Sequence, residues 1–257
     1  MSLWVDFFTW TGVVVRPAIV AAVLAVAWLG LRRAGFEGHA RTRAWFAVAV
    51  PLIAWFAAAT ALGRAGAFLP RPTGPVPAIP FAIVIPLTVG LVLLLRSRIH
   101  AAVAVAMPLS WLIGIQVYRV FGATFVAHWG AGNLPGVFAL PAGLGDMLVG
   151  ALAIPVALYA QARGRGWQAM AIAWNLLGIA DLLNAVTLGF LSAPGRFQLL
   201  ALDHPNLLVG TYPVVMIPAF VVPLSLILHG LSLAQLRHAA RREAAWPARP
   251  GSLPSFQ

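Results

Sequence analysis

Two acidic side chains lie inside long apolar stretches, which is the most unusual chemical feature of this sequence. Asp146 lies in LPAGLGDMLVGALAIP, and Asp181 lies in AWNLLGIADLLNAVTLGF. In a membrane, an ionisable group at such a position costs at least about 2.5–3.5 kcal/mol, so it needs a partner and marks a functional site by default. Two carboxylates at one level can bind a cation or a proton, or can act as an acid and a base.

Other polar side chains fall near the same level of the chain. Gln116 and Arg119 are one helical turn apart, and Asn184 follows Asp181 by three residues. Counting 1.5 Å per residue from the ends of their stretches puts Asp146 about 12 Å and Asp181 about 13 Å below the same face. We therefore predict a pocket open to the outside, formed by the aspartates with Arg119, Gln116, Asn184 and Tyr212.

A purely structural role explains the same pattern. Arg119 and Gln116 could pair with the two aspartates and lock three helices together. In the last apolar stretch, Ser225, His229 and Ser232 share one helical face, which either assists proton movement or packs between helices. Asn175 is expected to make a hydrogen bond between helices, and Arg16 is expected to extend to the outer membrane surface.

The segment Gly143-Leu144-Gly145-Asp146 resembles the GxGD motif of intramembrane aspartyl proteases. In that family the motif's aspartate pairs with another on the preceding helix, whereas here the candidate partner, Asp181, comes later in the chain. The resemblance covers four residues, and no catalytic role is carried over from it.

Histidines offer a metal alternative, and missing residue types exclude several cofactors. His128 and His204 could bind a metal with nearby aspartates, although no HxxxH or HExxH spacing occurs. The chain has no cysteine and no lysine. Covalent c-type haem, a retinal Schiff base and a pyridoxal phosphate Schiff base are therefore excluded.

The elements that must position these residues are membrane-spanning helices. The chain is 61% hydrophobic and only 9% charged, whereas a soluble domain carries about a quarter charged residues. We predict an all-α, polytopic bundle of seven transmembrane helices, forming one domain over residues 1–236, with a basic, proline-rich and disordered tail over 237–257. The predicted spans are about 12–31, 44–62, 79–95, 101–118, 138–160, 168–190 and 212–236, with a loop over 121–137.

The arginines predict how the bundle is oriented. Twelve lie in alternate connections and the tail, and four lie between spans on the opposite side. The positive-inside rule then places the N-terminus outside and the C-terminus in the cytoplasm of an inner membrane. The net charge of +11 therefore reports orientation and contact with anionic lipid head groups rather than nucleic-acid binding.

Three classes of function fit this pattern. The first is a membrane protein whose pocket binds a small polar or cationic ligand, or a proton, for transport or sensing. The second is an intramembrane hydrolase or transferase that uses the carboxylate pair, with or without a metal held by histidine and aspartate. The third is a structural subunit of a membrane complex.

Overall fold

A computed structural model describes residues 3–69 and 78–245 of the chain. This part is helical, without strands. Its elements are α1 (Leu3–Arg33), α2 (Gly38–Arg64), α3 (Ile79–Arg96), α4 (Arg98–Ala106), α5 (Leu109–Gly114), the 3-10 helix η1 (Ile115–Gly122), α6 (Ala123–Gly130), α7 (Gly136–Ala162), α8 (Trp167–Ser192), the 3-10 turn η2 (Leu208–Gly210), the π-helix η3 (Ile217–Val221) and α9 (Val222–Ala245).

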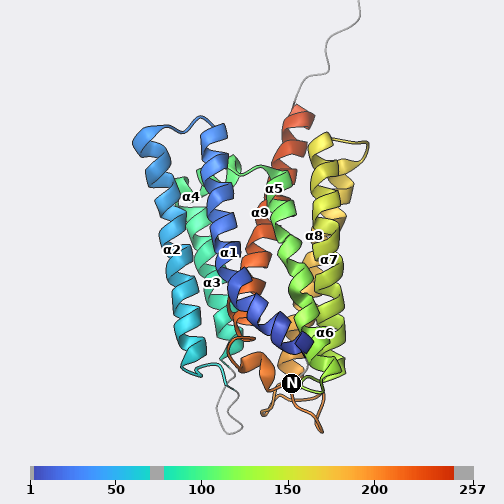
Figure 1. The fold of residues 1–257 in the computed structure, drawn as a ribbon. Helices are drawn as coiled ribbons and strands as arrows, with labels where there is room; N and C mark the ends of the chain where they lie inside the picture. The colour runs from blue at the N-terminus through green and yellow to red at the C-terminus, as the bar shows by residue number, and fades with distance from the viewer. Residues whose placement is uncertain (1–2, 70–77, 246–257) are drawn as a thin grey trace, which may run out of the picture.

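Within the described ranges, seven helical segments are long and apolar enough to cross a membrane. The long helices run side by side as one bundle (Figure 1). Six of the segments match predicted spans to within a few residues at most ends. The exceptions among those ends are the starts of the first helix, at Leu3, of the second, at Gly38, and of the last, at Ile217.

The fourth predicted span, 101–118, is wrong in its placement. The helix breaks at Met107 and Pro108, which are both extended, because a proline disfavours helical geometry in the residue before it. The membrane-length segment is instead Leu109–Gly130, formed by α5, η1 and α6 in succession. Most of the loop predicted over 121–137 is therefore helix, and the short α4 packs against α1, α2 and α3.

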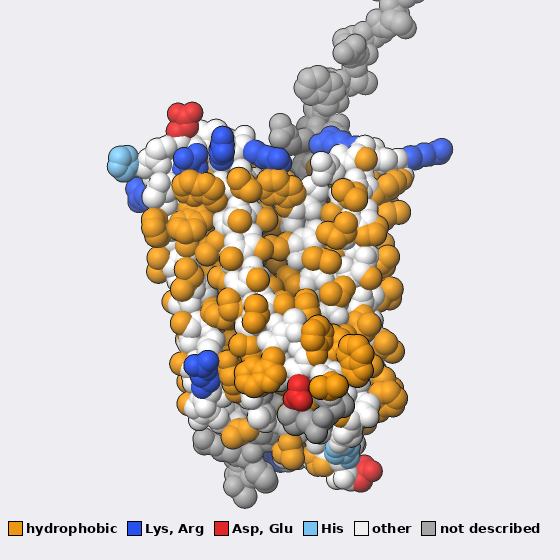
Figure 2. Space-filling model, viewed as in Figure 1, with side chains coloured by type: hydrophobic (Ala, Val, Ile, Leu, Met, Phe, Trp, Pro, Cys, Tyr) orange, Lys and Arg blue, Asp and Glu red, His pale blue; other side chains and the backbone are white. Residues whose placement is uncertain are grey.

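The two ends of the described chain lie at opposite ends of the bundle (Figure 1). Helix α9 continues to Ala245, so the first nine residues of the predicted tail are helical, while residues 246–257 lie outside the described part. Arginines gather at the end that holds the α1–α2 turn, and hydrophobic side chains cover the sides below it (Figure 2). This distribution is typical of a bundle whose sides face lipid.

Glycines allow α7 to approach its neighbours closely. A Cβ atom on Gly143 would lie 2.9 Å from the Gly122 carbonyl oxygen of η1, and one on Gly150 would lie 2.9 Å from the Arg119 carbonyl carbon. On α8, a Cβ atom on Gly178 would lie 3.0 Å from Nη1 of Arg119. Small residues at helix contacts permit such packing in membrane proteins, and here they bring η1, α7 and α8 together around Arg119.

Candidate functional site: an arginine between two aspartates

Arg119 is buried within the helical bundle and bridges Asp146 and Asp181. Its side chain is 1% exposed, against 13% for Asp146 and 8% for Asp181. Its Nε donates a hydrogen bond of 2.7 Å to Oδ1 of Asp146, and its Nη2 donates to Oδ2 of Asp181. One guanidinium therefore holds carboxylates from two neighbouring helices, α7 and α8.

The prediction that the two aspartates share one level is confirmed by this shared partner. Asp146 is ten residues from the start of α7 at Gly136, which is about 15 Å. Asp181 is eleven residues from the end of the antiparallel α8 at Ser192, which is about 16 Å. The cluster lies in the half of the bundle that is nearer the N-terminus.

The third guanidinium nitrogen extends the cluster to α9. Nη1 of Arg119 lies 3.4 Å from the Gly178 carbonyl oxygen and 3.0 Å from Nε2 of His229, which is fully buried. An arginine nitrogen is only a donor, so Nε2 of His229 must accept and carries no hydrogen. His229 is therefore the neutral tautomer with its hydrogen on Nδ1.

A chain of hydrogen bonds continues from His229 toward the other end of the bundle. Nδ1 of His229 donates to Oδ1 of Asn175 at 2.9 Å, and Nδ2 of Asn175 donates to Ser232 Oγ at 2.9 Å and to the Ala171 carbonyl at 2.7 Å. The predicted inter-helix hydrogen bond of Asn175 is confirmed. Along the series Arg119, His229, Asn175, Ser232, each residue donates a hydrogen bond to the next.

A small cavity lies on the other side of Arg119, between α1, η1, α6, α7 and η3. Its volume is about 40 Å³, and its polar lining comes from Arg16, Tyr118, Arg119, Thr124 and Asp146. Tyr118 is satisfied by Ser225, whose Oγ lies 2.8 Å from the phenol oxygen. Asp146 also lines a second cavity of about 60 Å³, which is otherwise apolar.

Arg16 turns inward, contrary to the expectation that it extends to the membrane surface. It is 6% exposed and lines the cavity, and its guanidinium lies beside Gly12, where a Cβ atom would come within 3.2 Å of Nη2. Gly12, one turn earlier, therefore leaves room for the side chain to fold back. That i, i+4 pairing of glycine and arginine is the sequence signal for this position.

Two predicted members lie outside the cluster. Asn184 is exposed on α8, because it lies about 60° around the helix from Asp181. Tyr212 packs instead under Arg64, whose guanidinium carbon lies 5.3 Å from the ring centroid. Gln116 is fully buried, and neither polar atom of its side chain has a hydrogen-bond partner among the described residues.

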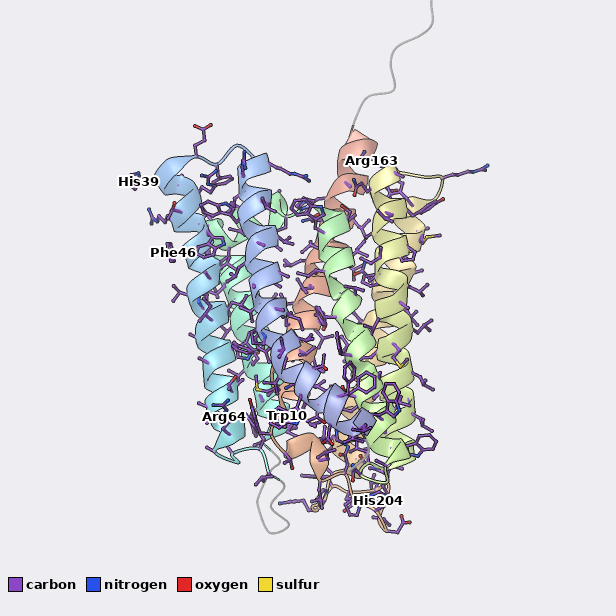
Figure 3. The ribbon with its side chains drawn as sticks, in the orientation of Figure 1. Trp10, His39, Phe46, Arg64, Arg163 and His204 are labelled. Carbon is purple, nitrogen blue, oxygen red and sulfur yellow. The ribbon has the colours of Figure 1, made fainter. Side chains whose placement is uncertain are left out.

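The two histidines considered as metal ligands are apart from the aspartates. The ring nitrogens of His128 lie 3.1 Å from Thr9 Oγ1 and 3.3 Å from Nδ2 of Asn133. His204 is exposed in the loop at the N-terminal end of the bundle (Figure 3). Residues 3–69 and 78–245 contain no group of three histidine, cysteine or acidic side chains that could hold a metal ion.

These features define a multi-pass, all-helical membrane protein with a buried ion-pair cluster. Residues 76–237 match a family described as a domain of unknown function, DUF8737, and this match covers more than half of the chain. The chain belongs to that family. The matched residues include both aspartates, Arg119 and His229, whereas Arg16 precedes them. No curated protein and no solved structure matches the chain.

Proposed function

We propose that this protein binds a proton on the cluster of Asp146, Arg119 and Asp181 and uses that proton in transport or sensing across an inner membrane. The observation that carries the proposal is the ratio of charges in direct contact: two carboxylates share one guanidinium. With both carboxylates ionised, the three side chains hold one net negative charge. A net charge is costly inside a membrane, and one bound proton removes it.

The contacts favour a proton over a larger cation as the cluster's ligand. Arg119 occupies the space between the carboxylates and donates to both, so a cationic ligand would have to displace a buried guanidinium. A proton needs no such space. The cavities that Asp146 lines are small accordingly, at about 40 and 60 Å³, and Asp181 lines neither of them.

The same contacts give less support to the enzyme alternative. An aspartate pair that works as an acid and a base shares a proton directly or positions a water between its carboxylates. Here, Arg119 lies between Asp146 and Asp181, although Asp146 carries the GxGD-like sequence. We therefore propose that the aspartates bind a proton rather than catalyse hydrolysis.

The proposed orientation has the N-terminus outside and the C-terminus in the cytoplasm. It is supported by the arginines that gather at the end of the bundle with the α1–α2 turn (Figure 2). In this orientation, the aspartate cluster lies in the outer half, and the arginine-rich end contacts the anionic lipid head groups of the cytoplasmic leaflet. Acidification of the outside should then add the proton to the aspartate cluster.

Infrared titration of the purified protein in lipid vesicles tests proton binding. A buried carboxylic acid absorbs apart from a solvated one, so we expect such a band to appear as the pH is lowered. The band should be lost in the double variant Asp146→Asn, Asp181→Asn and kept in Asp203→Asn, which changes an exposed loop aspartate. A wild-type protein without the band, or a double variant that keeps it, contradicts the proposal. In the former case, the cluster is a structural lock.

A further inference from the structure

Arg16 is a buried cation without an anionic partner. Among the described residues, both salt bridges belong to Arg119, and Arg16 makes no hydrogen bond. A guanidinium without a direct ion pair is unfavourable in a membrane interior, so this position favours a counter-anion whenever Asp146, which lines the same cavity, is not ionised to balance it.

The cavity beside Arg16 provides a second unpaired donor. Thr124, on α6, is 3% exposed and lines the same cavity, and its hydroxyl has no hydrogen-bond partner in the described part of the chain. Tyr118, in contrast, is already paired with Ser225. A guanidinium and a hydroxyl therefore both face one cavity from different helices, and both have hydrogens to donate.

We propose that this cavity binds a small monovalent anion of the size of chloride, held by Arg16 and Thr124. A volume of about 40 Å³ exceeds the space that one water needs and is sufficient for a small monovalent anion. Charge-assisted hydrogen bonds from arginine are the strong interactions of anion sites. Gly12 keeps the site open by leaving room for the guanidinium beside α1.

Asp146 lines the same cavity, and this links the anion to the proton. While both aspartates are ionised, Arg16 and Arg119 balance their charge, and Asp146 repels an entering anion. A proton on the aspartate pair removes one negative charge, so the binding of one anion then restores the charge balance. The site then takes up a proton and an anion together without a net change in charge. This coupling rests on the proposed function, whereas the anion site itself rests on Arg16 and Thr124.

Binding of radioactive chloride to the detergent-purified protein tests the site. We expect saturable binding that bromide displaces and that gluconate, a larger anion, does not. Arg16→Gln should weaken binding about tenfold or more, and Thr124→Val should weaken it about three- to tenfold. Arg64→Gln, which removes an exposed arginine from the same end of the bundle, should bind as the wild type does.

Proton uptake measured in weakly buffered solution separates the two proposals. Chloride addition should raise the pH with wild-type protein and should not do so with Asp181→Asn. If chloride binds and depends on Arg16 but no proton is taken up, the anion site stands and the coupling is wrong. If no saturable binding occurs, or if both the Arg16→Gln and Thr124→Val variants bind as wild type does, water fills the cavity and the anion site is refuted. Infrared titration still decides proton binding in that case.

Discussion

Gly145 of α7 lies directly against the carboxylate of Asp181 on α8. A Cβ atom at this glycine would overlap Oδ1 of Asp181, so the two helices are in tight contact at the ion-pair cluster. The carboxylate is consequently held between Arg119 on one side and the backbone of α7 on the other. The position of Asp181 thus depends on a residue that has no side chain.

Gly145→Ala should destabilise the protein by about 1–3 kcal/mol, because the added methyl forces α7 and α8 apart or moves Asp181 off Arg119. The free energy of unfolding in mixed detergent micelles measures the effect. Gly230→Ala is the matched control, since an added Cβ there meets open space next to His229. This control should be neutral or should gain up to about 1 kcal/mol from helix propensity. Equal effects at both positions would show that the close contact is unimportant.

Arg119→Met should destabilise the protein by about 3–5 kcal/mol, because it leaves two buried carboxylates without their shared cation. Thermal unfolding in detergent reports this change. The triple variant Arg119→Met, Asp146→Asn, Asp181→Asn should recover much of the loss, since neutral amides replace the unpaired charges. A triple variant less stable than Arg119→Met would contradict the electrostatic explanation.

His229 should be neutral, with its hydrogen on Nδ1, because Nε2 accepts from Arg119 and Nδ1 donates to Asn175. Nitrogen NMR of protein labelled at histidine distinguishes the tautomers by the shifts of the two ring nitrogens. His229→Ala should remove the assigned signal and identify it. An Nε2–H tautomer or a cationic ring at neutral pH would show that the donor order described here is incorrect.

The sequence was sufficient to predict the number of long helices and the shared level of the two aspartates. Both follow from the length of apolar stretches and from 1.5 Å of rise per residue. Arg119 was also expected as a partner of Asp146 and Asp181, and the structure places it between them. The break at Met107 and Pro108 was missed because the surrounding residues are apolar on both sides of it.

The rest of the cluster could not be predicted, since it depends on which helices become neighbours. The inward turn of Arg16 requires η1 and α6 to lie beside α1, and the local signal at Gly12 shows room for the side chain but not that packing. Asn184 was assigned to the cluster from its spacing after Asp181, and Tyr212 from its depth, although neither fixes the direction of a side chain. The helical face predicted for Ser225, His229 and Ser232 was closer to the outcome. On this face, His229 contacts Arg119, and Ser232 accepts a hydrogen bond from Asn175.

Single cysteines should report the orientation, and the natural chain contains no cysteine that would interfere. His204→Cys and Ala34→Cys are both at exposed positions, at opposite ends of the bundle. We expect a membrane-impermeant maleimide to label His204→Cys on intact spheroplasts and to label Ala34→Cys only after lysis. The reverse pattern would place the N-terminus in the cytoplasm and would refute the orientation drawn from the arginines.

The uniform donor order from Arg119 to Ser232 has an electrical consequence. A guanidinium in a protein does not give up a proton, and its N–H occupies the lone pair of His229 that a migrating proton would need. The polar series through the centre of the bundle therefore blocks proton conduction rather than supporting it. If the cluster binds a proton as proposed, that proton has no path beyond Arg119 along this series.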